Sequence, residues 1–488
     1  MKKWKCIICG AIVEGDTPPV ACPVCGVGPE LFEEVIEEAI SEVTFSTANS
    51  SSKAWKCIIC GAIVEGETTP SICPVCGVGS EMFELVAPTS APQTTDTNRK
   101  VVIIGNGIAG VSAATTLREY DKTAEIMIIS RDANLSYNRP MLTKRLATNP
   151  NINDLLIHDE KFYRDQKITV MLNHEVVSIN TDTKQIKLSS DKLVDYDELV
   201  IATGSNSFIP PIQGINHAHV HALRTYEDAR AIYNEAKKLK SIAILGGGVL
   251  GIEAACSLYE LGIKIHIIES GDRIMKRQLD SLTSKFVEKS LEDHHVILHK
   301  NVSTDAITTN DDGLNIYLSN SDILSVDMIL VSTGVRSELK LIEGTNIKAE
   351  RSILVDEHMR TSVPNIYACG DNASYEGINY NLYTQALEMG KVAGANIGNN
   401  PIKYEQMVPN VTFKLFENSI FAIGDLGNDK TKDYQVVTYS DELKKIFKCQ
   451  YFINDKFVGG VIINAINDSK NFIDAYINHT HISKIKVS

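Results

Sequence analysis

From residue 99 onward, short apolar runs alternate with glycine-rich turns and amphipathic stretches. Val101–Ile104 and Ile242–Leu245 are two such runs, and each ends in a glycine turn that opens a predicted helix. Continuous apolar runs are typical of buried parallel strands, and their alternation with helices indicates doubly wound sheets. The pattern predicts an α/β protein with two doubly wound domains. From about residue 404, alternating apolar and polar positions that end in a helix predict a C-terminal α+β domain.

The N-terminal part is a tandem repeat. Residues 4–35 and 55–86 match at an offset of 51, with 25 of 32 positions identical. Residues 37–53 and 87–98 have no apolar period and are rich in small and polar residues, which predicts linkers. We therefore expect the second repeat to move as a tethered unit that does not dock permanently.

Eight of the eleven cysteines form four CxxC pairs inside the repeats. A CxxC turn points two thiolates at one place, and two facing turns complete a tetrahedral metal site. Four sulfur ligands suit iron or zinc, so each repeat is predicted to hold one such ion. The predicted ligands are Cys6, Cys9, Cys22 and Cys25 in the first repeat, and Cys57, Cys60, Cys73 and Cys76 in the second.

Composition narrows the class of protein. Hydrophobic residues make up 43% and charged residues 22%, no apolar run approaches the roughly 20 residues of a membrane helix, and no secretory signal pattern opens the chain. The formal net charge of −13, without any basic block, disfavours nucleic acid. We expect a cytoplasmic protein whose partners are small molecules and proteins, and the sequence leaves homo-oligomerisation open.

Two glycine turns are predicted to bind dinucleotides. Such turns let the backbone approach a pyrophosphate, which lies at the N-terminus of the following helix. Two turns about 140 residues apart indicate one flavin and one nicotinamide site in Rossmann-like domains. The glycines concerned are Gly105, Gly107 and Gly110 in the first turn, and Gly246, Gly248 and Gly251 in the second.

Acidic residues near these turns predict the cofactor. Glu269 lies 18 residues past Gly251 at the end of a predicted strand, where a carboxylate binds a ribose 2′-OH and repels a 2′-phosphate. This favours NADH over NADPH. The corresponding acid is missing from the first site, and Asp132 is the predicted substitute, with a solvated loop carboxylate as the alternative.

Further motifs resemble the flavoproteins that carry two dinucleotide-binding domains. They are Thr203-Gly204, Thr333-Gly334 and the segment from Thr361 to Asp371. The resemblance implies FAD and NADH as cofactors, with Asp371 at the FAD ribitol and Thr203, Gly204 and Gly334 at the cofactor sites. The predicted domains are 1–36 and 54–86 for the repeats, 99–217 with 338–403 for FAD, 218–337 for NAD and 404–488 for a C-terminal interface domain.

Leu135–Lys144 resembles the PYxRPxLSK segment of ferredoxin and rubredoxin reductases, and no cysteine occurs between Gly105 and Gly246. Relatives that reduce disulfides, oxygen or peroxide carry cysteine there. The resemblance implies that Arg139 and Lys144 contact FAD and that Lys144 lies beside the flavin N5. It also implies that Glu253 pairs with Lys144 near the nicotinamide, and that Tyr383 lies against the flavin.

The repeats resemble the rubredoxin-like domain of rubrerythrins, through Trp4–Gly10, Cys22–Cys25 and Phe32-Glu33. This resemblance implies two redox-active irons. The expected function is an NADH oxidoreductase that passes electrons through FAD to these irons and to an external redox protein, feeding removal of oxygen, superoxide or peroxide in an anaerobe. The alternatives are a flavin reductase with structural zinc ribbons that act as docking modules, and an NADH oxidase or peroxidase.

Overall fold

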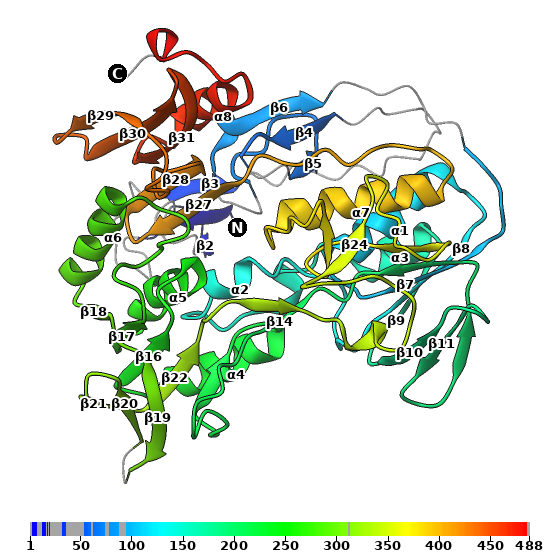
Figure 1. Ribbon diagram of the computed structural model, residues 1–488, viewed down its shortest axis with the longest axis horizontal. Coiled ribbons are helices and arrows are strands. Elements are labelled where there is room, and N and C mark those ends of the chain that lie inside the picture. The colour runs from blue at the N-terminus through cyan, green and yellow to red at the C-terminus, as the bar shows by residue number, and fades with distance from the viewer. Residues whose placement is uncertain are drawn as a thin grey trace. The chain divides into compact units, whose positions relative to one another are not determined.

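The computed structural model of the 488-residue chain divides into two compact units, residues 1–52 and 53–488, which are described separately (Figure 1). The described residues are 2–6, 12–15, 17, 19, 32–35, 53–59, 62–73, 78–86, 94–310 and 313–485. Within them, helices that could cross a bilayer are not found.

A five-stranded parallel sheet forms the core of the first dinucleotide-binding region. Its order is β25-β13-β7-β8-β9, and every neighbouring pair is parallel. The strands are β7 (Lys100–Ile104), β8 (Glu125–Ile129), β9 (Ile168–Met171), β13 (Glu198–Ile201) and β25 (Ile366–Ala368). Apolar side chains on both faces of β7 are buried, which explains the continuous apolar run in its sequence.

Helices α1 (Ile108–Tyr120) and α7 (Tyr383–Ile397) pack against each other beside this sheet (Figure 1). Their backbones approach closely at Gly394, where an added Cβ would lie 2.3 Å from the carbonyl oxygen of Ala113. A larger residue at position 394 would separate the helices. A second close approach occurs at Gly390, whose added Cβ would lie 2.3 Å from the carbonyl oxygen of Ala109, so α7 lies along the helix that follows the first glycine turn.

The second parallel sheet has the order β15-β22-β16-β17-β18. Its strands are β15 (Val220–Ala222), β16 (Ser241–Leu245), β17 (Lys264–Glu269), β18 (Ile297–Lys300) and β22 (Met328–Val331). Its helices are α4 (Tyr226–Ala236), α5 (Val249–Tyr259) and α6 (Ser281–Asp293). Two doubly wound sheets confirm the predicted α/β fold class.

Smaller elements surround the two sheets. β14 (Ser205–Ser207) pairs with β23 (Val335–Ser337) and so joins the segments that enter and leave the second sheet. Other elements of these two domains are β10 (Val176–Asn180), β11 (Gln185–Leu188), β12 (Leu193–Asp195), β19 (Thr304–Thr309), β20 (Leu314–Leu318), β21 (Ile323–Val326), β24 (Ile353–Val355), β26 (Ala373–Tyr375), α2 (Met141–Lys144) and α3 (Glu160–Asp165).

The C-terminal domain is an antiparallel sheet of order β27-β28-β31-β30-β29, followed by α8 (Ser469–Ile477). The strands are β27 (Asn410–Leu415), β28 (Asn418–Gly424), β29 (Gln435–Asp441), β30 (Ile446–Ile453) and β31 (Lys456–Ile463). Phe421, Phe452 and Phe457 are fully buried in this domain. The alternating pattern of the sequence thus forms a sheet that ends in a helix, as expected.

Each repeat forms a three-stranded antiparallel ribbon with its first strand in the centre. We call residues 2–35 ribbon 1, with β1 (Lys2–Cys6), β2 (Ile12–Gly15) and β3 (Phe32–Val35), and residues 53–86 ribbon 2, with β4 (Ala54–Cys57), β5 (Ile63–Glu65) and β6 (Phe83–Val86). The registers are equivalent, since Cys6 faces Phe32 and Cys57 faces Phe83. The two similar sequences therefore form the same strand arrangement.

Ribbon 2 is not free of the body. Its buried residues share one apolar cluster with the C-terminal domain, and Figure 1 shows β4 and β6 beside α8. Lys470 on α8 forms an ion pair with Glu84 on β6. This docking differs from the expected tethered movement. The composition of the linker predicted a mobile ribbon. The ribbon is too small to bury its own apolar face, however, and this face attaches it to the C-terminal domain.

Candidate functional site

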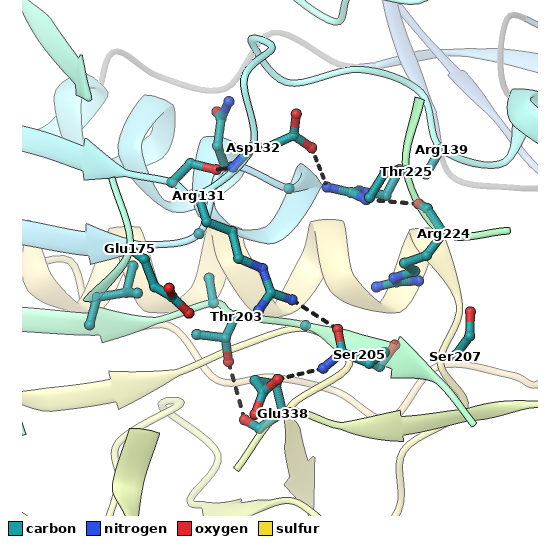
Figure 2. A pocket seen from close by; sticks show the side chains of 18 of the residues that line it. Arg131, Asp132, Arg139, Glu175, Thr203, Ser205, Ser207, Arg224, Thr225 and Glu338 are labelled. Atoms are coloured by element: carbon teal, nitrogen blue, oxygen red, sulfur yellow. Dashed lines mark hydrogen bonds and ion pairs between the residues drawn. The ribbon is translucent and has the colours of Figure 1, made fainter. Parts of the chain in front are cut away.

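A cavity of about 1030 Å³ opens at the carboxyl end of the first parallel sheet. Ligands of doubly wound proteins bind at this end of the strands. The cavity is lined by the predicted FAD residues Gly105, Gly107, Asp132, Arg139, Thr203 and Gly204. Figure 2 shows several of its side chains, including Asp132, Arg139 and Thr203. These six residues, which come from distant parts of the sequence, lie around one space, whereas the predicted FAD residues Gly110, Lys144, Asp371 and Tyr383 are not among its lining residues.

The first glycine turn is built for close backbone contact. Gly105 has φ +115°, and an added Cβ would lie 2.1 Å from the carbonyl oxygen of Ala202. At Gly110 an added Cβ would lie 2.1 Å from the carbonyl oxygen of Gly105. At Gly107, by contrast, an added Cβ would meet no atom of the described residues within 4 Å. Two glycines serve the turn itself, whereas Gly107 leaves space on the side of the cavity.

The N-terminus of α1 is available to an anion. Its N-cap is Gly107, and the described residues supply no side-chain cap there, whereas Thr225 caps α4 with a capping box. Uncapped N–H groups and the helix dipole favour a phosphate at this position. Cavity size, glycine turn and helix end together fit the pyrophosphate of FAD.

The second glycine turn repeats this geometry. Gly246 has φ +112°, its added Cβ would lie 2.4 Å from the carbonyl oxygen of Ser332, and the space around Gly248 is open among the described residues. Glu269 at the end of β17 accepts hydrogen bonds from the N–H groups of Gly247 at 2.8 Å and Gly271 at 2.7 Å. The predicted ribose acid therefore lies directly beside the turn. Gly334, with φ +97°, follows the neighbouring strand β22.

Asp132 lines the cavity, but its carboxylate is engaged by the protein. Its Oδ2 accepts hydrogen bonds from Tyr137 at 3.1 Å and from Arg139 at 3.2 Å. Arg139 also donates to the carbonyl oxygen of Arg224 at 2.9 Å. Burial raises the pKa of the Tyr137 hydroxyl, while the charge of Arg139 acts in the opposite direction and that of Asp132 adds to the rise, so the hydroxyl stays a donor. The interaction of Asp132 with Arg139 positions the guanidinium, and contact of Asp132 with a ribose stays a prediction.

Asp371 lies at the centre of a second set of interactions. Its Oδ2 accepts from Ser205 Oγ at 2.7 Å and from Arg224 Nη2 at 3.2 Å, and Ser337 donates to its carbonyl oxygen at 2.7 Å. Burial lowers the pKa of Arg224, while the charge of Asp371 acts in the opposite direction. The carboxylate is thereby held by Ser205 and Arg224, two residues that line the cavity and are labelled in Figure 2.

Lys144 and Glu253 are brought to adjoining helices, α2 and α5. Thr143 donates a hydrogen bond to Glu253 Oε2 at 3.0 Å. Burial raises the pKa of the Glu253 carboxyl, whereas the charge of Lys144 and the bond from Thr143 lower it. Lys144 thus acts on Glu253 electrostatically, and Thr143 is its direct partner. Tyr383 is the first residue of α7 and is not among the residues that line the cavity, so its contact with the flavin stays a prediction.

Sequence reasoning missed several residues of the cavity. Arg131 reaches across it to Asn206, with Nη2 2.9 Å from Oδ1 (Figure 2). Glu338 accepts from Asn206 and, through its backbone, from Thr203 at 3.3 Å. Arg224 donates to Asp371, which lies 147 residues away in the sequence. These contacts carry no local signal in the sequence.

The metal ligands are described in part. Cys57 and Cys73 are buried, and each donates its backbone N–H to the carbonyl five residues later, Ala62 and Val78, at 2.7 Å. Equivalent turns with two buried sulfurs fit the two knuckles of a four-cysteine site. The backbone of Cys6 lies in β1, and its side chain is not among the described ones. Outside the described residues lie Cys9, Cys22, Cys25, Cys60 and Cys76.

Comparison with known proteins defines the class of this chain. Residues 99–390 match the pyridine nucleotide-disulphide oxidoreductase family, and residues 4–33 and 55–84 match the rubredoxin-like domain of rubrerythrin. The chain belongs to that oxidoreductase family and carries two rubredoxin-like domains. It is therefore an enzyme of the oxidoreductase class, as predicted.

Individual relatives narrow the type. An NADH-rubredoxin oxidoreductase from Clostridium acetobutylicum is 30% identical over 394 residues, which cover 78% of this chain and 99% of the relative. The crystal structure of NADH:rubredoxin oxidoreductase from that organism has a TM-score of 0.69 at 28% identity, covering 80% of this chain and 97% of that one.

A longer relative is the assimilatory nitrate reductase electron transfer subunit from Bacillus subtilis, 28% identical over 390 residues, or 80% of this chain and 50% of the relative. A nitrite reductase from Bacillus subtilis is matched over 48% of its length. The chain thus spans about half the length of these two curated relatives.

Proposed function

We propose that the chain is an NADH-dependent flavoprotein that passes electrons through FAD to its two rubredoxin-like iron centres and to an external rubredoxin-type protein. The observation that carries the proposal is the fusion of two ribbons to a reductase body without a thiol relay. Cys256, Cys369 and Cys449 are the cysteines of that body. Burial raises the pKa of these thiols to about 12, 12 and 11, respectively, which disfavours reactive thiolates.

The roles of the residues follow from the two turns and the helix pair α2/α5. FAD, when bound, accepts a hydride and releases electrons singly, which suits one-electron acceptors. Glu269 would hold the ribose of NADH, and the open sides of Gly107 and Gly248 would admit the two pyrophosphates. Lys144 would place a positive charge beside the flavin, where negative charge develops on reduction. Glu253, held by Thr143, would keep that lysine in place.

The metal in each ribbon is proposed to be iron, and the downstream acceptor a protein that removes oxygen, superoxide or peroxide. We place the reaction in the cytoplasm. An NADH oxidase from Methanocaldococcus jannaschii is 30% identical over 364 residues, so direct reduction of oxygen is the second candidate. The lack of a cysteine between Gly105 and Gly246 favours the first candidate.

An anaerobic visible spectrum with iron and zinc analysis tests the proposal. Ferric tetrathiolate is red and should bleach on addition of NADH, with two irons per chain. Stoichiometric zinc and an unchanged spectrum would instead support ribbons that serve only as docking modules. Oxygen uptake with NADH, measured with and without an added rubredoxin, distinguishes the proposed function from an NADH oxidase. If the added rubredoxin did not change the rate of oxygen uptake, direct reduction of oxygen would be favoured.

A further inference from the structure

Ribbon 2 and the C-terminal domain share one hydrophobic core. The cluster contains the fully buried Cys57 of the ribbon and the fully buried Phe421 and Phe457 of the sheet. Its other buried members are Ile59, Ala62, Cys73, Val78, Met82 and Phe83 from the ribbon, and Ile423, Phe452, Ile462, Phe472 and Ala475 from the C-terminal domain. A domain of this size buries too little apolar surface by itself, so this face stabilises the ribbon.

A charged pair lies at the edge of this contact. Lys470 on α8 binds Glu84 on β6, and the two side chains are 50% and 55% exposed. An exposed ion pair contributes little to stability. The apolar cluster therefore supplies the attachment, and the ion pair favours one orientation of ribbon 2 on α8.

The same cluster extends toward the FAD side of the molecule. Val408 packs against it, and the Sδ of the preceding Met407 accepts a hydrogen bond from Thr384 Oγ1 at 3.8 Å in the first turn of α7. Tyr476 of α8 also packs against this cluster. The segment that packs against the cluster of ribbon 2 thus also contacts the first turn of α7, where the flavin contact is predicted.

We propose that ribbon 2 takes up electrons while docked on the C-terminal domain, and that it is the first acceptor of the chain. This inference rests on the proposed function. Each NADH supplies two electrons, each ferric centre accepts one, and the products are NAD⁺, two ferrous centres and one proton released to solvent. The C-terminal domain is then a permanent docking site for the acceptor, and electron transfer to ribbon 2 does not require the ribbon to move.

Carbodiimide coupling of the full-length enzyme tests the docked state. The reagent joins the Lys470 amine to the Glu84 carboxylate as an amide, and the lost oxygen leaves in the urea by-product. We expect the 84–470 cross-link in peptide mass spectra of the wild type. Lys470→Arg is the matched control, because a guanidinium keeps the ion pair but does not couple under these conditions.

The rate of iron bleaching after mixing with NADH is then compared between the cross-linked wild type and the equally treated Lys470→Arg enzyme. An unchanged first-order rate supports transfer in the docked position. A missing cross-link, or a cross-link that abolishes bleaching while the flavin is still reduced, overturns the inference. Wild-type enzyme that does not bleach at all, with the cross-link present, refutes the proposed function instead.

The tandem repeat provides a second test of the order of transfer. Cys73→Ser in ribbon 2 and Cys22→Ser in ribbon 1 are the same change at equivalent positions. We expect Cys73→Ser to lose the fast phase of bleaching and Cys22→Ser to retain it, with the iron content measured for both. Loss of the fast phase in Cys22→Ser alone would show that ribbon 1 is reduced first.

Discussion

The hydroxyl of Thr143 donates a hydrogen bond to the carboxylate of Glu253 over 3.0 Å, which joins the end of α2 to the first turns of α5. Lys144, the next residue, acts on the same carboxylate through its charge. The pair of residues that sequence resemblance assigned to catalysis is therefore a group of three. The sequence motif drew attention to Lys144 and not to Thr143, yet Thr143 makes the hydrogen bond to Glu253.

Replacement of Thr143 by Val should weaken this group. The change preserves the shape of the side chain but leaves a carboxylate that burial already disfavours without its donor. We expect the free energy of unfolding of the FAD-bound enzyme to fall by about 1–3 kcal/mol at neutral pH. Thr148→Val, which changes an exposed hydroxyl, is the control. Equal stability of the two variants by chemical denaturation would contradict the predicted role.

The raised pKa of Glu253 predicts a pH dependence of stability. Its folded-state pKa lies above the ordinary value of 4.5, so ionisation of this group favours the unfolded chain. The stability that its neutral form contributes is present below pH 4.5 and is lost as the pH rises through the folded-state pKa. Glu253→Gln should therefore gain stability relative to the wild type as the pH rises above about 4.5.

Denaturation of both proteins across this range measures that difference, with Glu260→Gln, an exposed residue at the C-cap of the same helix, as control. If the stability of Glu253→Gln relative to the wild type fell as the pH rose, the prediction would be contradicted.

Lys144→Met tests the charge beside the flavin. The variant should bind FAD but be reduced by NADH about tenfold more slowly or worse, since a cation that stabilises developing negative charge is lost. Arg145→Met removes the neighbouring cation, which pairs with Asp154 at 3.6 Å, and should reduce at the wild-type rate. Stopped-flow absorbance of the flavin gives both rates. If the two variants behave alike, Lys144 acts only as a surface residue.

Glu269 should determine the choice of nicotinamide. Its two oxygens accept from Gly247 and Gly271, which fixes the carboxylate beside the second turn. We expect the wild type to prefer NADH, and Glu269→Gln to narrow the ratio of kcat/KM between NADH and NADPH by about tenfold or more. Asp272→Asn, an exposed acid nearby, is the control. Equal use of NADPH by the wild type would disprove the assignment.

The local motifs could be predicted from the sequence because short spacing determines them. The strand, glycine turn and helix at Gly105 and Gly246, and the acid Glu269, all depend on residues within one βαβ unit. Contacts such as Arg224 with Asp371 join segments 147 residues apart, and their residue types alone do not pair them. The docking of ribbon 2 could not be predicted from the sequence either. The composition of a linker indicates how freely it moves, but it does not show that an apolar face of the ribbon packs against Phe421.

Two glycines of one turn should respond differently to alanine. At Gly105 a Cβ would lie 2.1 Å from the Ala202 carbonyl oxygen at φ +115°, so Gly105→Ala should destabilise the protein even without FAD. At Gly107 φ is −83° and the described residues leave the space open, so Gly107→Ala should keep the melting temperature of the apoprotein. Its methyl group would instead occupy the place predicted for the pyrophosphate.

We therefore expect Gly107→Ala to lose about 1–3 kcal/mol of FAD binding free energy, as overpacking of a filled site does. The flavin-to-protein absorbance ratio after purification, titration of the apoprotein with FAD and melting curves with and without cofactor measure the two effects separately. Gly248→Ala, the equivalent change in the second turn, should retain FAD and weaken NADH instead. If Gly107→Ala retained full FAD affinity, the pyrophosphate would not lie at the N-terminus of α1, and the cavity at the end of the first sheet would need another ligand.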